Sequence, residues 1–524
     1  MDLEKELLDG FSAALGVPAD AALAEYVRNG ENLPPGNGKL LAWDANSIHS
    51  FVFDTTNATG IRGASDVLRG IDEDLRNGSA LGVRQEQILF SGGGSGLAVV
   101  AEHEVEACKR RLHRIFATKT SIATCTAQEV DLVSGEESFK QRVGAVSRAL
   151  GRNRMLTGPD AEPSVPFFAA RCVVCGRRSA AVRAPRWGAA AEGRLECQPC
   201  YDRIEQGKKN VRFQGEPTDF ADIADNGGKG FYSVLYLDGN GIGQTISHLK
   251  SPLDYASFSR AIDRIIRASF QQVVKEYGLH EDGDGGSRTG AYQRPICGGD
   301  DVVAILPGDV AVPFTRDLLL RLEQAADAEP TLRSTRFGAS AGVAVGHAKF
   351  PIRHLLAEAE GLLQMAKRRA YEPASPRSTL SFAVVTDGSP RTETMEPERW
   401  KRQEGELLLS GQPYTLPEMV ELSRRFRAVR DARKVGRNQL YSLHAHAVRG
   451  PRQLRNHVLY QIGRREEWCD LAVALGGGDA SLVRDPDLCE GQFTPEYGKR
   501  RVFDVADMIE LLGHWREPEG RKGS

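Results

Sequence analysis

Two short segments of the sequence place carboxylates beside glycines at the ends of apolar runs. Asp238 follows the run Phe231–Leu237, and two more aspartates close the run Gly298-Gly299-Asp300-Asp301. Because glycine has no Cβ and accepts positive φ, a hairpin turn of this kind lets the backbone come close to a triphosphate. Carboxylate and phosphate oxygens are ligands that Mg²⁺ prefers. The pattern predicts a metal-dependent nucleotidyltransferase in which Asp238, Asp300 and Asp301 are catalytic and hold Mg²⁺ or Mn²⁺.

The role of each residue follows from strand geometry. Adjacent side chains alternate between the faces of a strand, so one of Asp300 and Asp301 is predicted to bind metal directly while the other adjusts the site or binds a second ion. The Gly239 carbonyl is a further candidate ligand, and Lys367, near the end of a predicted helix, is a candidate contact for the β- and γ-phosphates. Ions held in this way promote attack by a ribose hydroxyl and stabilise the leaving pyrophosphate. The alternative is that Gly-Gly-Asp-Asp is only a polar hairpin turn.

The elements that must position these residues occur twice in the chain. Strands are predicted at 40–43, a pair within 87–100, and 121–125, with helices at 64–75, 102–115 and 136–150. A second set has strands at 231–237, a hairpin around 298–299, 337–345 and 379–385, and helices around 258–274, 314–325 and 352–369, with a Gly/Asp loop at 281–290. Both sets begin with the β-α-β-β-α-β order that is typical of the ferredoxin-like arrangement.

The two sets also resemble each other in sequence. Leu41–Ile48, which contains Asp44 and Asn46, aligns with Tyr236–Ile242, and Ile88–Val99 aligns with Pro295–Ala304. The second alignment sets Gly92-Gly93-Gly94 against the acidic hairpin. We interpret this as an internal duplication in which the first copy has lost the carboxylates. Two facing palms are predicted, one catalytic and one holding a nucleotide, the alternative being a chance recurrence of two glycine-rich hairpins.

The predicted fold class is α+β, with two ferredoxin-like palm domains of the nucleotidyl cyclase or polymerase kind, a zinc-ribbon insert and a C-terminal helical domain. At 524 residues the chain is too long for one ordinary core. The predicted segments are a helical leader at 1–37, a degenerate first palm at 38–155, the insert at 156–228, the catalytic palm at 229–388 and the helical domain at 389–524.

Four cysteines form two C-x-x-C pairs in the insert: Cys172, Cys175, Cys197 and Cys200. Their spacing is that of a zinc ribbon, and four thiolates make a closed, structural Zn²⁺ site. A redox interpretation would need a pair at the start of a helix in a thioredoxin-like unit, and neither pair is expected there. The surrounding arginines predict either an RNA-facing surface or ordinary solvated charge: Arg171, Arg177, Arg178, Arg183, Arg186 and Arg194.

Composition limits the remaining possibilities. The net charge of −2 gives no global case for nucleic-acid binding, so any basic surface must be local. One such stretch runs from Glu421 to Glu467, with twelve Arg or Lys against four Asp or Glu, and is predicted to dock a protein partner or, alternatively, to bind RNA phosphates. There is no apolar run of membrane-spanning length and no signal-peptide pattern at the N-terminus. We expect no membrane association and a cytoplasmic location.

Taken together, these motifs resemble the large polymerase/cyclase subunit of type III CRISPR effector complexes, particularly the Cmr-type branch. Smaller shared features are Arg62-Gly63-Ala64-Ser65 and Gly411–Leu416. The resemblance implies that two palms bind two ATP molecules and join them 3′ to 5′ into cyclic oligoadenylate when target RNA is bound, with other effector subunits and guide RNA as partners. It implies metal binding by the three aspartates, phosphate contact by Lys367, and nucleotide contacts by Gly239, Asn240, Gly243, Gly298, Gly299, Ser91, Gly92, Gly93 and Gly94.

Two departures from the family pattern affect the expected activities. The chain contains no His-Asp dipeptide, so the DNA nuclease that the family often carries is not expected here. Asn240 stands where many relatives have Asp, which weakens the prediction of a two-metal site. The alternatives are an architectural RNA-binding subunit with a vestigial palm, a stand-alone cyclic-nucleotide synthase and, least favoured, a diguanylate cyclase, because valines follow the acidic pair.

Overall fold

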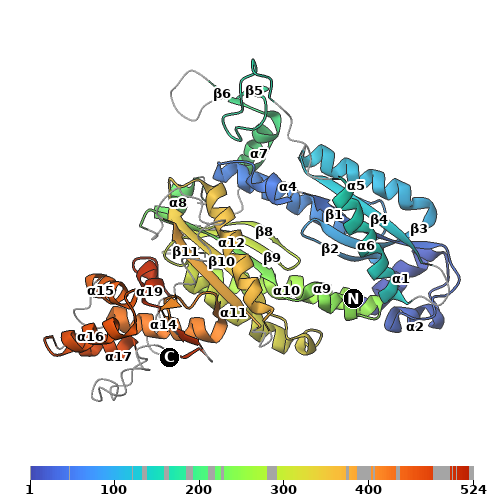
Figure 1. The fold of residues 1–524 in the computed structure, drawn as a ribbon. Coiled ribbons are helices and arrows are strands. Elements are labelled where there is room, and N and C mark those ends of the chain that lie inside the picture. The colour runs from blue at the N-terminus through green and yellow to red at the C-terminus, as the bar shows by residue number, and fades with distance from the viewer. Residues whose placement is uncertain are drawn as a thin grey trace.

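The computed structural model describes residues 2–46, 48–120, 122–132, 138–157, 165–184, 193–209, 217, 219–225, 229–279, 292–372, 377–385, 403–404, 407–431, 437–465, 467–475, 496–497, 500–502 and 504–518. Two units of sheet and helix lie side by side, with a small projection above them and a helical group beyond the second unit (Figure 1). Within these ranges no helix is long and apolar enough to cross a membrane. The predicted loop at 281–290 and Arg186 lie outside the described residues.

The first unit is the predicted ferredoxin-like palm. Its four antiparallel strands have the order β2-β3-β1-β4. The elements are β1 (Gly38–Asn46), α3 (Ile48–Phe53), α4 (Ala58–Arg76), β2 (Ile88–Gly92), β3 (Ser95–Ala101), α5 (Val105–Thr120), β4 (Thr124–Leu132) and α6 (Phe139–Thr157). Two helices precede the palm, α1 (Leu3–Leu15) and α2 (Ala21–Asn29), and both contact α10 of the second palm as well as each other.

The second unit repeats this plan and extends it. Its sheet has the order β14-β11-β10-β7-β9-β8, in which β8-β9-β7-β10 corresponds to the four strands of the first palm. The elements are β7 (Phe231–Gly239), α9 (Ile242–His248), α10 (Pro252–Glu276), β8 (Gln293–Gly298), β9 (Asp301–Pro307), α11 (Ala311–Ala328), β10 (Ala339–His347), α12 (Ile352–Ala370), β11 (Thr379–Val385) and β14 (Tyr414–Thr415). The last strand comes from beyond residue 388.

The two palms share buried apolar side chains. One core cluster contains Leu41, Trp43 and Ile61 of the first palm together with Val234 and Val303 of the second, all fully or almost fully buried. A helix of each palm also packs on a strand of the other, because α4 contacts β8 and α10 contacts β2. Burial of this apolar surface on both sides joins the palms into one packed body.

The insert and the C-terminal group complete the chain. The insert contains β5 (Val182–Ala184), β6 (Arg194–Glu196), α7 (Gln198–Lys209) and α8 (Phe220–Asp225). The C-terminal group contains α14 (Leu416–Asp431), α15 (Arg437–Ala447), α16 (Pro451–Ile462), α17 (Glu467–Leu475) and α19 (Val505–Leu511). It also contains a small sheet that the sequence did not predict, made of β12 (Gln403–Glu404), β13 (Leu407–Leu408), β15 (Glu496–Tyr497) and β16 (Arg500–Val502).

Several arginines of the basic C-terminal stretch bind carboxylates of the same chain. Arg425 is buried and pairs with Asp504 at 2.6 Å. Arg424 pairs with Glu421 at 2.7 Å. These contacts neutralise part of the positive charge that the sequence concentrates here, which weakens the interpretation of the stretch as an RNA surface.

Candidate active site

The acidic hairpin lies at the end of the central strands of the second palm. The antiparallel strands β7 and β9 pair as far as Leu237 and Val302. Asp238 follows Leu237 and Asp301 precedes Val302, so the two aspartates lie side by side on adjacent strands. Gly299 has φ +63°, the left-handed conformation that glycine adopts at low cost. A Cβ at Gly239 would lie 2.9 Å from the Asp300 Cβ, so only glycine allows Asp300 this position. The structure therefore brings all three predicted aspartates together.

The charges at this site are strongly coupled. The Lys367 ammonium, in the last turn of α12, donates to Asp238 Oδ2. Burial, followed by the charge of Asp238, raises the pKa of the Asp300 carboxyl to about 6. Burial and the charges of Asp238 and Asp300 raise the pKa of Asp301 to about 8. A carboxylate whose pKa is raised by neighbouring carboxylates lies where a cation would be stabilised.

These residues fit a divalent cation by the chemistry of the donor set. Three carboxylates from two adjacent strand ends supply hard oxygen ligands of the kind that Mg²⁺ and Mn²⁺ take. The aspartates are less tightly grouped than the four cysteines, which are the group of ligand atoms found within 4.8 Å of one another in the described part of the chain. Lys367 is close enough to Asp238 to contact a phosphate bound beside it.

The glycine turns of the two palms touch. A Cβ on Gly298 would lie 2.9 Å from the Gly93 backbone nitrogen, and one on Gly92 would lie 3.3 Å from the Gly299 nitrogen. Gly93 and Gly94 have φ values of +61° and +81°. The missing side chains thus allow two hairpin turns to meet backbone to backbone, and the predicted facing arrangement of the palms is what the structure shows.

A cavity lies on each side of this meeting point. The first is bounded by α3 and α4 of the first palm and by β8 of the second, with Gly93, Gly94, Gly298 and Asp301 at its inner end. The second is bounded by α9 and α10 and by the β2–β3 turn, and it also reaches Gly93, Gly298 and Asp301. Gly92, Gly299 and Asp300 line this second cavity. Asp301 therefore faces both cavities.

The first palm keeps the geometry of the site and loses its charge. Asp44, at the end of β1, corresponds to Asp238, and it accepts a hydrogen bond from Ser95 Oγ at 2.7 Å and pairs with Arg154 of α6. Ser95 pairs with Asp44 in the sheet and occupies the position that Asp301 has in the second palm. Arg154 binds Asp44 as Lys367 binds Asp238. The first palm has one carboxylate where the second has three.

Three other residues are predicted nucleotide contacts: Asn240, Gly243 and Ser91. The Asn240 amide donates to the Arg377 carbonyl at 2.9 Å and accepts from Ser340 Oγ at 2.8 Å, so it holds the strand end in place. Gly243 lies in the first turn of α9 with open space where a Cβ would be. Ser91 is buried and lines neither cavity. Nucleotide contact by these residues stays a prediction.

Several cavity residues carry no sequence motif and were not predicted. Asp72 accepts the Gly94 N–H at 3.0 Å and so fixes the first-palm turn, and burial raises the pKa of its carboxyl to about 6. His49 Nε2 lies 2.8 Å from the Tyr236 hydroxyl. Four arginines also line the first cavity: Arg69, Arg76, Arg267 and Arg294. Apart from the predicted glycines and Asp301, Ser65 is the lining residue that belongs to the Arg62–Ser65 motif.

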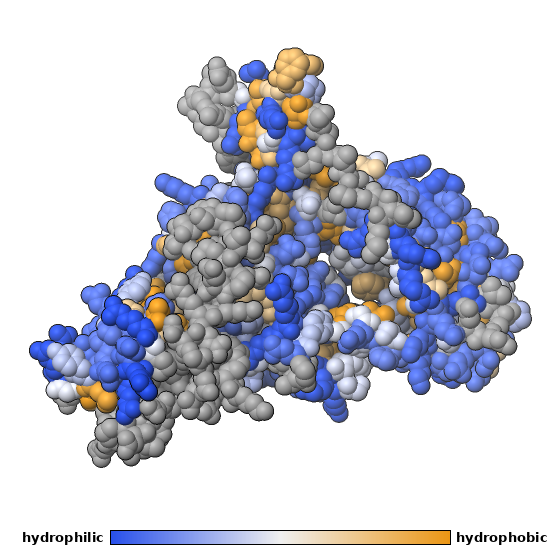
Figure 2. Space-filling view, in the orientation of Figure 1, coloured by the Kyte–Doolittle hydropathy of each residue, from blue (hydrophilic) through white to orange (hydrophobic). Residues whose placement is uncertain are grey.

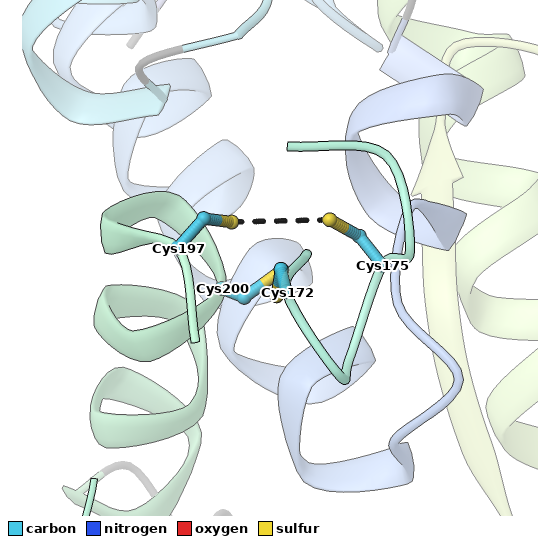
Figure 3. Close-up of side chains that lie close together, drawn as sticks. All are labelled: Cys172, Cys175, Cys197 and Cys200. Carbon is cyan, nitrogen blue, oxygen red and sulfur yellow. Dashed lines mark hydrogen bonds between the residues drawn. The ribbon is translucent and has the colours of Figure 1, made fainter. Parts of the chain in front are cut away.

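The four cysteines of the insert come together as predicted (Figure 3). Their sulfur atoms lie within 4.8 Å of one another, and those of Cys175 and Cys197 are 3.9 Å apart. Tetrahedral Zn²⁺ with bonds of about 2.3 Å places its sulfurs about 3.8 Å apart, so the cluster fits zinc. Cys197 immediately precedes α7 and Cys200 lies in its first turn, so this pair does stand at a helix start, but the described sheet of the insert has only two strands, β5 and β6, and is not a thioredoxin-like unit.

The base of the cysteine cluster is attached to both palms. Asp54 of the first palm is almost fully buried and contacts four guanidinium groups, those of Arg177, Arg178, Arg203 and Arg353. Arg353 belongs to α12 of the second palm, and it donates to the Cys175 carbonyl at 3.3 Å and to the Phe53 carbonyl at 3.2 Å. We call this group the Asp54 hub.

The insert helix α7 packs closely on α4 of the first palm. A Cβ at Gly63 would lie 1.8 Å from the Arg203 carbonyl oxygen, and one at Gly207 would lie 2.0 Å from that of Thr59. The two helix backbones can approach this closely only because both positions are glycine. The insert is therefore held against a helix that lines the first cavity.

Residues 231–372 match the family model of the Cas10/Cmr2 second palm domain. This segment is similar to the second palm of Cas10-type proteins. The resemblance to the large subunit of type III CRISPR complexes is thereby confirmed at the level of the Cas10 type, whereas the Cmr-type branch stays a prediction. A comparison with curated proteins finds no significant match.

Solved structures resemble the chain over most of its length. Csm1 of T. onnurineus shares 14% identity over 92% of this chain and 70% of its own, with a TM-score of 0.53. A chain of the Csm1–Csm4 cassette in complex with pppApA shares 14% identity over 97% and 72%, with a TM-score of 0.54. A chain of the cassette in complex with cA4 shares 13% identity over 94% of this chain and 73% of its own, with a TM-score of 0.52. At these identities the likeness establishes the fold.

Proposed function

We propose that this chain is a metal-dependent nucleotidyltransferase that converts ATP into cyclic oligoadenylate, a second messenger of CRISPR-type antiviral defence. The observation that carries the proposal is the pair of cavities that meet at the glycine turns, with Asp301 facing both. A template-copying enzyme needs a groove for a strand, whereas two cavities around one acidic centre suit the joining of two nucleotides. Structures of the Csm1–Csm4 cassette with one ATP and with cA3 support this use of the fold.

The residues of the site have complementary roles in this reaction. Asp238, Asp300 and Asp301 would hold Mg²⁺ or Mn²⁺, which when bound neutralises charge on the reacting phosphates. Lys367 contacts the phosphates as a point charge, and the glycine turns let the backbone approach both nucleotides. The 3′-oxygen of one nucleotide bonds to the α-phosphorus of the other, pyrophosphate leaves, and the hydroxyl proton is released. The close approach of the two cavities supplies the orientation for this step.

The first palm acts as the holder of the second nucleotide. Its turn has the same left-handed glycines as the second palm, yet Ser95 stands in place of a carboxylate. With one charged pair in place of three carboxylates, it lacks the ligands for a second catalytic ion. The acidic hairpin of the second palm is then the single centre for every bond formed.

Activation and partners follow from the same proposal. Several of the similar solved structures contain Csm1 together with Csm4, and we propose that this chain likewise works with other effector subunits. Guide RNA paired with target RNA is the proposed activator, because the cavities lie at a joint between two palms whose geometry a bound partner can bias.

The test is incubation of the purified chain with radiolabelled ATP and Mg²⁺ or Mn²⁺, with and without its guide-RNA complex and target RNA. We expect pyrophosphate release and cyclic products in mass spectrometry, with GTP and mixed-nucleotide reactions establishing base preference. Absence of pyrophosphate under every condition, with RNA demonstrably bound, would contradict the proposal. Intact assembly and defence with Asp300→Ala and Asp301→Ala would instead favour an architectural subunit with a vestigial palm.

A further inference from the structure

The outer end of the insert presents two aromatic rings to solvent. The insert forms the projection at the top of the molecule, and orange side chains gather at its outer end beside deep blue ones (Figure 2). Phe167 is 100% exposed and Phe168 is 80% exposed, and Val173 nearby in sequence is 58% exposed. Single exposed apolar residues are common, but two adjacent, almost fully exposed phenylalanines are typical of a binding surface.

The two rings are carried on an ordered frame. Their centroids are 5.3 Å apart with an interplanar angle of 84°, so each ring leaves a face open. The Ala169 N–H donates to the Pro166 carbonyl at 2.9 Å and closes the turn that holds both rings. Beyond this turn, the Ala180 N–H donates to the Ala170 carbonyl at 2.8 Å, within the cysteine ribbon. The rings therefore require little further ordering when they bind a partner.

The charge of the ribbon that carries the rings has one sign at its surface, over the described residues 165–184 and 193–200. The described residues 165–184 and 193–200 contain five arginines and one acidic residue, Glu196, which is buried. Arg177 and Arg178 contact Asp54 at the base of the ribbon, while Arg171, Arg183 and Arg194 are exposed. The whole chain has a net charge of −2, so this positive charge is a local feature and not a property of the chain as a whole.

We propose that the outer end of the ribbon binds single-stranded RNA. Unpaired bases stack on the open faces of Phe167 and Phe168, and the guanidinium groups of Arg171 and Arg194 contact phosphates. Stacking on aromatic rings combined with arginine–phosphate contacts is how single strands are held without sequence preference. An acidic protein partner would satisfy the arginines, but it would not use two ring faces set at right angles to each other. This RNA site is separate from the nucleotide cavities and does not depend on the proposed chemistry.

The proposal is tested with the full-length chain and a fluorescein-labelled, unstructured 15-nucleotide polyuridine RNA. We expect Phe167→Ala/Phe168→Ala to weaken binding by at least about 30-fold in fluorescence anisotropy, since each of the two stacked bases contributes about 1–3 kcal/mol and about 1.4 kcal/mol is tenfold. Tyr441→Ala removes another half-exposed aromatic, far along the chain in α15, and should leave the affinity unchanged. A duplex of equal length should bind the double variant and the original chain equally, because its bases are already stacked.

Two further variants separate stacking from folding. Phe167→Tyr/Phe168→Tyr retains ring faces and should restore binding, while zinc content and the unfolding profile report an intact ribbon. Arg171→Ala/Arg194→Ala should reduce the salt dependence, lowering the slope of log K against log salt by about 1.4 for two phosphate contacts. Crosslinks from 4-thiouridine should map to the turn at residues 166–169.

Three results would overturn the proposal. The first is an unchanged affinity for the single strand in the double alanine variant. The second is crosslinks that all map outside the ribbon. The third is loss of a co-purifying effector subunit from the double alanine variant while RNA affinity is retained, which would assign the rings to a protein interface.

Discussion

The two palms have the same sheet order and the same glycine turns, yet only one has the charges for catalysis. Asp300 and Asp301 in the second palm correspond to Gly94 and Ser95 in the first, and Lys367 corresponds to Arg154. The shape of a nucleotide site therefore depends on the strands and the turn, while its chemistry depends on two side chains at the turn. A duplicated palm can lose the chemistry and still serve as one wall of the site.

The largest expected difference between the palms is at the carboxylates. Asp301→Asn should lower the rate of nucleotidyl transfer about 10³-fold, because it removes a ligand from the centre that neutralises phosphate charge. Asp44→Asn, the matched change in the first palm, should stay within about tenfold of the original rate. The measurement is pyrophosphate release at saturating ATP and Mg²⁺. Equal losses in both variants would mean that each palm is a catalytic centre.

Removal of the zinc predicted for the ribbon should destabilise the first palm more than the second. Chelation, or Cys175→Ser, should lower the stability of the first palm and the ribbon by several kcal/mol, since a closed four-thiolate site contributes directly to folding. Hydrogen exchange should show earlier opening of α4 and α7 than of α10 and α11, because α7 packs on α4. Uniform exchange over both palms after chelation would argue that the ribbon does not favour the first.

The two cations should differ less than the carboxylates do. Lys367→Met should cost about 10- to 100-fold in kcat/KM for ATP, the value of a charge-assisted contact to phosphate. Arg154→Met, its counterpart, should cost at most about fivefold, because the pair that it forms with Asp44 is half-exposed. Steady-state kinetics with both variants would show this, and a larger effect at Arg154 would reverse the assignment of the two palms.

The smallest expected difference is at the turn glycines. Gly94→Ala should destabilise the fold by about 1–3 kcal/mol, because its φ is +81° and the new Cβ would lie 2.3 Å from Ile48 Cδ1. Gly299→Ala introduces the same backbone strain with nothing within 4 Å of the Cβ, and it should cost about 1 kcal/mol. The difference between the two variants in unfolding free energy, measured by thermal unfolding, gives the contribution of the contact between the new Cβ and Ile48. If Gly94→Ala costs no more than Gly299→Ala, the first-palm turn is not held by Ile48.

Most of the palm fold was predictable because strand and helix patterns are local. The strands at 231–237 and 379–385 were predicted almost to the residue, since both are short runs of mostly apolar, buried residues. Strand β4 runs to Leu132, whereas the predicted strand ends at residue 125. The prediction ended too early because several of the later residues are polar and only partly buried, so they carry no apolar signal. The short strands of the C-terminal sheet are two or three residues long and carry no periodic signal.

The acidic half of the site was predictable and the rest was not. Asp238 and the Asp300–Asp301 pair lie at strand ends with glycines beside them, which a sequence shows directly. Asp72 and Arg154 lie near the C-terminal ends of helices α4 and α6, and no motif connects them with a turn 22 residues or a strand 110 residues away. The family resemblance implied a nucleotide contact by Ser91, but Ser91 lines neither cavity.

The Asp54 hub has a mechanical consequence. Arg353 of the second palm and Asp54 of the first contact each other, and both contact the base of the ribbon, so the ribbon is attached where the two palms meet. A displacement of the ribbon base therefore acts on both palms at their boundary. It must either rotate the palms relative to each other or break a buried ion pair, so the ribbon can transmit force from a distant contact to the glycine turns.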